Sequence, residues 1–179
     1  MKRSFGYKHI VVGVAVALAL TGCANAKTKT DPAPSGTTHG AKPNDGAPAA
    51  KQLTIKTYYA DDNLDKLIER EATITFASDS DKYKAALNAL KTSPDASLSS
   101  LSKGIDYRSA AFKDGQVVVD LAIAAEGRLG SPGEQLLVES IRKSLFQFAE
   151  VQSIDVLVEG KQTESLMGHV SLPHPIKRN

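Results

Sequence analysis

The sequence contains one cysteine among 179 residues and no tryptophan. A single cysteine can form no internal disulfide, so the folded part must be stabilised by its own hydrophobic core. Aromatic residues make up only 6% of the chain, which leaves little for stacking on bases or sugars. These shortages exclude a disulfide scaffold and argue against a site built on aromatic stacking.

The chain also lacks an excess of positive charge once the first residues are set aside. The chain has 22 Lys and Arg residues against 20 Asp and Glu residues, but Lys2, Arg3 and Lys8 fall in a leader that we expect to be removed. The remainder is close to neutral, whereas a phosphate-binding face needs a net basic stripe. We therefore expect no nucleic-acid partner.

The leader is residues 1–22, which we predict to be a signal peptide. Its apolar core, residues 10–20 (IVVGVAVALAL), follows the three basic residues. This run is too short to cross a bilayer as a helix but has the length of a signal-peptide core. We therefore expect the protein to be exported.

The leader ends in Leu20-Thr21-Gly22-Cys23, which resembles the bacterial lipobox. The resemblance implies cleavage between Gly22 and Cys23 and attachment of a diacylglyceryl group to the Cys23 thiol. Because two acyl chains suffice for stable anchoring, we expect a lipid-anchored protein on the extracytoplasmic face of the cell membrane. An ordinary secretory signal with an incidental cysteine, or a retained anchor, is the alternative.

Residues 23–51 are rich in Ala, Gly, Pro, Thr and Lys and show no apolar periodicity. Such a composition is typical of a solvated, flexible tether. Hydrophobic periodicity begins at Gln52, so we assign residues 52–179 to a single folded domain.

Within that domain the pattern predicts strands and helices in the order β-β-α-β-β-α-β. The expected elements are strands 53–59, 64–76, 104–112, 116–121 and 154–158 and helices 78–92 and 131–148. At the second helix, Ser131 is predicted to be the N-cap and Glu134 to complete a capping box. The fold class is therefore α+β, with two helices packed on a mixed, largely antiparallel sheet of about five to six short strands. Residues 175–179 are expected to be frayed.

One loop has the features of an anion site. Gly127, Arg128, Gly130 and Gly133 precede the second helix, where free N–H groups and the helix dipole could bind an anion. The spacing fits neither the dinucleotide-binding nor the P-loop pattern, and Glu134 would repel a phosphate. A structural loop is the favoured interpretation.

Catalytic and metal-binding patterns are not found in the sequence. The serines of residues 97–103 have no paired histidine, so a loop with Leu98 and Leu101 turned inward is expected there. His169 and His174 lack a third ligand for zinc and are interpreted as ordinary surface histidines. We predict no catalytic residue, no metal and no cofactor.

The order of elements resembles the GerMN domain family, which occurs in lipoproteins of sporulation and germination. The resemblance rests on Tyr58-Tyr59, on residues 85–90 before Pro94, on residues 113–121 and 130–134, on residues 151–160 and on residues 166–170. It implies one GerMN domain and no catalytic residues. The order also resembles the ring-building motif, whose modules assemble side by side.

We therefore expect a non-enzymatic, lipid-anchored envelope protein that binds other envelope proteins, or copies of itself in a ring. The resemblance adds a role in sporulation or germination. The alternative is a small-ligand or anion-binding lipoprotein, or an enzyme, that uses the loop from Gly127 to Gly133.

Overall fold

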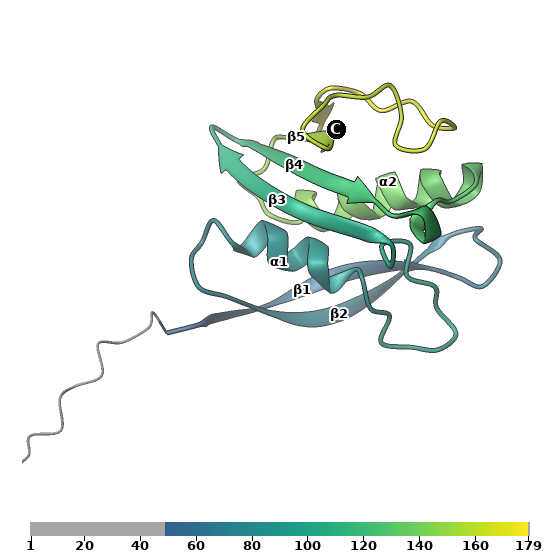
Figure 1. Cartoon of the computed structure of the whole chain (residues 1–179). Helices are drawn as coiled ribbons and strands as arrows, with labels where there is room; N and C mark the ends of the chain where they lie inside the picture. Colours follow the sequence, from purple (N-terminus) through teal and green to yellow (C-terminus); the bar gives the residue numbers. More distant parts are fainter. Residues whose placement is uncertain (1–48, 179) are drawn as a thin grey trace, which may run out of the picture. The chain divides into compact units, whose positions relative to one another are not determined.

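The computed structural model describes residues 49–178, which form two helices and six strands (Figure 1). The predicted signal peptide, Cys23 and nearly all of the predicted tether lie outside these residues. The α+β class with two helices is confirmed. The strands divide between a two-stranded and a four-stranded sheet, whereas the sequence analysis treats them as one sheet.

The two-stranded sheet is the predicted first hairpin. Strand β1 (Lys51–Ala60) pairs antiparallel with β2 (Leu67–Phe76). Alternate residues of the hairpin, including Ile55, Tyr59 and Ile74, are buried on its inner face. The turn between the strands is held by Asp61, whose Oδ1 accepts the N–H of Asp65 at 2.8 Å.

Helix α1 (Lys82–Ala89) is shorter than the predicted 78–92. The Asp81 carboxylate accepts hydrogen bonds from the N–H and hydroxyl of Ser78 at 3.0 and 2.6 Å. It therefore closes a turn before the helix and does not cap it. The apolar face is as predicted, with Tyr83, Ala86 and Leu87 buried.

The four-stranded sheet has the order β3-β4-β5-β6. Its strands are β3 (Ile105–Lys113), β4 (Gln116–Ile123), β5 (Ser153–Val158) and β6 (Ile176–Lys177). Strands β3 and β4 are antiparallel and joined by a two-residue turn in which Asp114 and Gly115 have φ of 49° and 83°, a conformation that glycine takes without strain. Strand β5 is parallel to β4 and antiparallel to β6.

Helix α2 (Ser131–Phe146) connects β4 to β5. Its Leu137, Ile141 and Leu145 are buried in one core cluster with residues of the four-stranded sheet. On an adjoining face Ser140 is small enough for β1 to approach, and its hydroxyl donates to the main-chain oxygen of Tyr58 at 2.9 Å. The helices thus pack between the hairpin and the larger sheet (Figure 1).

The predicted capping box of α2 is wrong. Gly130 is the N-cap, Ser131 is already helical, and no side chain caps this end. The Glu134 side chain turns into the protein, where it is fully buried, because it binds main-chain groups of a distant segment.

The predicted fraying of residues 175–179 is also wrong for the residues up to 178. Ile176 is buried and lies in β6. The Arg178 guanidinium donates to the main-chain oxygens of Phe148 and Val151 at 2.6 and 2.7 Å. The C-terminal residues are ordered because Arg178 satisfies carbonyl groups just beyond the C-terminal end of α2.

Candidate functional site

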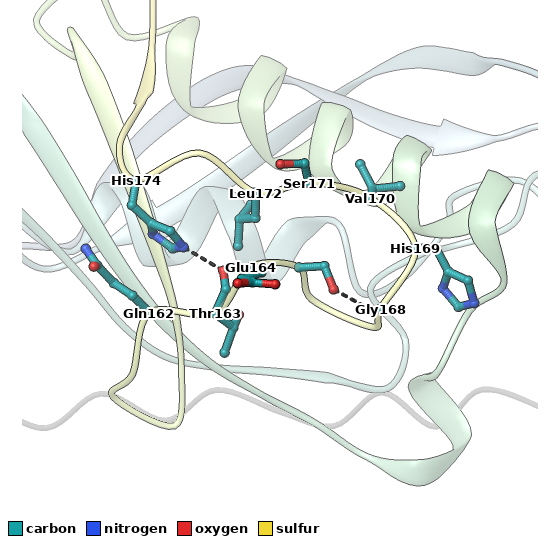
Figure 2. Close-up of a pocket in the computed structure, with 10 residues that line it drawn as sticks. Gln162, Thr163, Glu164, Gly168, His169, Val170, Ser171, Leu172 and His174 are labelled. Carbon is teal, nitrogen blue, oxygen red and sulfur yellow. Dashed lines mark hydrogen bonds between the residues drawn. The ribbon is translucent and has the colours of Figure 1, made fainter.

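A prominent concave feature of the described surface lies in the C-terminal loop, residues 159–175, between β5 and β6. It is an open hollow of about 650 Å³ whose lining comes entirely from residues 162–174 (Figure 2). Figure 2 shows His174 on one side of the hollow and His169 on the other. The two histidines therefore do not converge on one point.

His174 is fixed from both ring nitrogens. Nδ1 lies 2.6 Å from Asp155 Oδ1, and Nε2 lies 2.7 Å from the main-chain oxygen of Thr163. Its side chain is 16% exposed, so the prediction of an ordinary surface histidine is wrong for this residue. The hydrogen bond to the Thr163 oxygen and the Asp155 carboxylate raise the pKa of His174, although burial opposes this.

Glu134 connects the first turn of α2 to the same loop. Its carboxylate accepts the N–H groups of Met167 and His169, both at 3.0 Å, and lies 2.9 Å from His169 Nδ1. Burial raises the pKa of Glu134, but the hydrogen bonds from Met167 and His169 outweigh it, so the pKa lies below its ordinary value. This carboxylate holds the loop on the helix and has no free oxygen for chemistry.

The glycines of the predicted anion loop serve different purposes. A Cβ on Gly127 would lie 2.5 Å from the oxygen of Gly104, and one on Gly133 would lie 2.9 Å from Cβ of Leu129. Both glycines therefore permit close packing. Gly130 has open space around it.

Arg128 turns toward the C-terminal loop, where Nη2 lies 3.5 Å from the Met167 oxygen. Gly127 and Gly133 thus serve close packing, and Arg128 turns toward the C-terminal loop. The buried, negatively charged Glu134 also lies in the first turn of the same helix. This arrangement does not favour an anion.

Other polar residues singled out from the sequence have structural partners. In the serine loop, Ser100 donates to the Leu90 oxygen and Ser102 lies 2.8 Å from the Tyr107 hydroxyl. Leu98 and Leu101 of that loop are buried, as predicted. Among residues 49–178, no group of three or more His, Cys, Asp or Glu side chains could hold a metal ion.

Sequence reasoning missed Asp155 and Thr163 as partners of His174. Asp155 alternates with buried apolar residues in a strand, a pattern that indicates only a solvent-facing position. The contact depends on the C-terminal loop returning across β5, and no local pattern contains that information.

The fold and this hollow define a class of protein: a small α+β domain in which the side chains of Glu134 and His174 hold a long loop in place. None of the helices in the described part of the chain is long and apolar enough to cross a membrane.

A family described as "Germane: Sporulation and spore germination" matches residues 56–164. The chain therefore belongs to the Germane (GerMN) family, as the sequence resemblance predicted. No curated protein matches the chain.

Several solved structures share the fold, among them three GerMN or lipoprotein structures. The first GerMN domain of the sporulation protein GerM from Bacillus subtilis has a TM-score of 0.55 at 17% identity, covering 70% of this chain and 98% of that one. The tandem GerMN domains of the same protein give 0.51 at 24% identity, covering 80% and 49%. A Clostridium perfringens protein described as a candidate lipoprotein gives 0.50 at 19% identity, covering 72% and 88%.

Proposed function

We propose that this chain is an envelope lipoprotein, anchored through a diacylglyceryl group on Cys23, whose GerMN domain binds other proteins and catalyses no reaction. The observation that carries the proposal is the structural use of His174, which lines the hollow, and of Glu134, which is buried beneath the same loop. His174 and Glu134 are both fully engaged in holding the C-terminal loop. These two side chains therefore serve to position the loop, and we infer that the exposed surface of the loop serves recognition.

The anchoring is supported by the sequence Leu20-Thr21-Gly22-Cys23 ahead of the domain and by the fold shared with a candidate lipoprotein. It is tested with Cys23→Ser in the full chain. The unmodified protein should sediment with membranes and incorporate a lipid label. The Cys23→Ser variant should incorporate no label and should appear in the soluble fraction. Membrane retention of the variant would overturn the anchoring.

The binding role is tested by cross-linking on intact cells, with a photoreactive residue placed on the exposed surface of the domain. Discrete cross-linked products that depend on the position of the photoreactive residue support the proposal. A uniform absence of products at all surface positions contradicts it.

The process we propose is sporulation or spore germination, because the family is described in those terms. Deletion of the gene in the source organism should lower the yield of heat-resistant spores or slow germination, and the full chain should restore it. Normal spores and germination after deletion would remove this part of the proposal and leave the binding role standing.

A further inference from the structure

The sheet edges of this domain are covered to different extents. On β1, the Gln147 amide accepts from the N–H of Lys56 at 2.8 Å and donates to its oxygen at 3.0 Å, as a neighbouring strand would. Further along the strand, Ser99 pairs with Ala60. Strand β6 has only two residues. These edges offer little to another chain.

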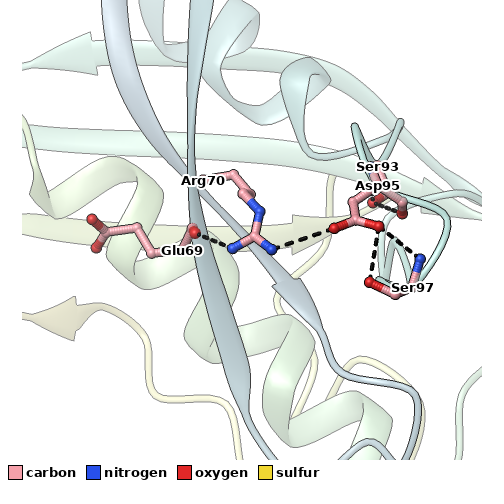
Figure 3. A network of polar contacts seen from close by, with 5 residues as sticks. All are labelled: Glu69, Arg70, Ser93, Asp95 and Ser97. Atoms are coloured by element: carbon pink, nitrogen blue, oxygen red, sulfur yellow. Dashed lines mark hydrogen bonds and ion pairs between the residues drawn. The ribbon is translucent and has the colours of Figure 1, made fainter.

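Strand β2 is protected by charge. The Arg70 guanidinium donates to the main-chain oxygen of Glu69 at 2.9 Å and lies 3.4 Å from the Asp95 carboxylate, which Ser97 also binds (Figure 3). The strand also carries the exposed charged side chains of Glu71 and of Glu69, which pairs with Lys56 on β1 at 2.9 Å. Charged residues at an edge are a common protection against strand pairing.

Strand β3 also has open main-chain groups along part of its edge, and these lie beside two hollows. Its terminal pair, Lys113 and Gln116, flanks the two-residue turn, so Lys113, Ala111 and Ser109 are the residues that exchange hydrogen bonds with β4. Ala110 and Phe112 therefore direct their N–H and C=O groups away from the sheet. Within residues 49–178 these groups have no hydrogen-bond partner outside the strand pairs.

A groove runs beside this open edge. Two adjoining hollows of about 260 Å³ each lie between β3 and the N-terminal end of α1, and both are lined by Ser80. One is bordered by Lys84 and Ala110 and the other by Tyr83 and Phe112. The Ala110 side chain is buried in the core, so it does not stand between the open main-chain groups and an approaching chain.

The groove also carries an exposed aromatic side chain. Phe112 is 38% exposed, and its ring stacks on Tyr83 at a centroid distance of 5.3 Å. In the described part of the chain, Phe112 and Leu53 are the large hydrophobic side chains that remain exposed. An aromatic side chain left at a sheet edge beside a groove is a suitable anchor for an apolar residue.

The groove is lined by charged side chains of both signs. Two of its carboxylates have their own partners, since Asp79 pairs with Lys51 and Asp81 accepts from Ser78. Arg108 pairs with Glu159 at 3.1 Å, and Lys82 pairs with Glu150 at 2.5 Å. The Lys84 ammonium instead donates to the Arg108 main-chain oxygen at 2.8 Å and has no carboxylate partner within residues 49–178. An acidic side chain entering the groove would neutralise it.

We propose that the groove binds an extended segment of another protein, which adds to the four-stranded sheet as a strand beside Ala110 and Phe112. The segment places an apolar side chain on Phe112 and an acidic side chain at Lys84. Lys84 contacts the main-chain oxygen of Arg108, which precedes Phe112 by four residues on β3, so the two positions on a paired strand are about four residues apart. This inference rests on the proposed binding function and identifies its surface.

The test uses the mature chain carrying Cys23→Ser and a phage-displayed library of random ten-residue peptides. Selected peptides should contain an apolar and an acidic residue at the stated spacing. In amide hydrogen exchange, the bound peptide should protect the N–H groups of Ala110 and Phe112. Selection of no peptide, or protection of β2, overturns the inference.

Two variants separate the main-chain and charge contributions. Ala110→Pro removes an N–H that is not bonded to β4, so the fold should survive while peptide affinity falls by about tenfold or more. The matched control, Thr73→Pro, removes an outward N–H from β2 and should leave affinity unchanged. Lys84→Glu should change the selected acidic residue to a basic one. Equal affinity of the Ala110→Pro variant, with its fold intact by circular dichroism, contradicts the inference.

The other outcomes are also distinguishable. Concentration-dependent dimerisation that Ala110→Pro abolishes would replace the external partner with a second copy of this chain. If cellular cross-links persist unchanged in Ala110→Pro, the binding function stands but this surface is wrong. If no cellular cross-links form, the proposed function fails even where peptides bind in vitro.

Discussion

The carboxylate of Glu134, in the first turn of α2, lies 2.9 Å from Nδ1 of His169 in the C-terminal loop. The same carboxylate also accepts main-chain N–H groups of His169 and Met167. One buried side chain therefore joins two segments more than thirty residues apart. A buried carboxylate is stabilised only when its oxygens are well supplied with donors, as they are here.

We predict that Glu134→Gln destabilises the domain by about 2 to 3 kcal/mol, because charge-assisted hydrogen bonds are lost and a buried N–H is left without an acceptor. Urea unfolding of the mature chain measures this. Glu139→Gln is the control on the same helix, since Glu139 pairs with Arg142 on the surface, and it should change stability by less than about 0.5 kcal/mol. A similar loss in both variants would contradict the role of Glu134.

The stabilisation by Glu134 should depend on pH. Its folded-state pKa lies below the ordinary value of 4.5, so the contribution is fully present above that value and is lost as pH falls through the folded-state pKa. The stability difference between the unmodified chain and Glu134→Gln should be constant near neutral pH and shrink in acid. A difference that grows as pH falls below 4.5 would show that the sign is wrong.

The opposite pH dependence is expected for His174. Its pKa is raised above 6.5 by the Thr163 oxygen and Asp155, so its contribution is fully present below pH 6.5 and is lost as pH rises through the folded-state pKa. His174→Ala should cost about 1 to 2 kcal/mol at pH 6 and less at pH 9. Nuclear magnetic resonance titration of the His174 ring should give a midpoint above 6.5, and Asp155→Asn should lower it.

Gly127 is predicted to tolerate no side chain. The Cβ of Gly127→Ala would lie 2.5 to 2.8 Å from main-chain atoms of Gly104, so the backbone must shift and stability should fall by about 1 to 3 kcal/mol. Gly130→Ser, in the same loop, meets no atom within 4 Å and supplies an N-cap hydroxyl, so it should stabilise by a few tenths of a kcal/mol. Thermal unfolding distinguishes the two; a neutral Gly127→Ala would contradict the close-packing argument.

Arg178 should contribute to stability despite its place near the chain end. Arg178→Ala removes two hydrogen bonds to main-chain oxygens and the contact of the guanidinium with the Phe146 ring, 5.0 Å from its centroid. We expect a loss of about 1 to 3 kcal/mol in urea unfolding. Lys177→Ala, at an exposed neighbouring position, should cost less than about 0.5 kcal/mol. Equal effects would indicate that the C-terminal residues contribute little.

Periodicity in the sequence determined the existence and order of the main elements. The alternation from Val117 to Leu121 predicted a strand, and the helical spacing of Leu137, Ile141 and Leu145 predicted the buried face of α2. Both are local consequences of side-chain geometry, since a strand repeats every two residues and a helix every 3.6. The family resemblance, carried by the order of these elements, was equally accessible from the sequence.

The tertiary structure alone decided where the polar side chains went. Glu134 had the spacing of a capping box but is drawn inward because Met167 and His169 offer unpaired N–H groups there. His174 looked like a surface residue until the C-terminal loop brought it to Asp155 and Thr163. Their partners lie from 11 to 35 residues away, and pairing at such distances depends on how loops return across the sheet, which no local repeat encodes.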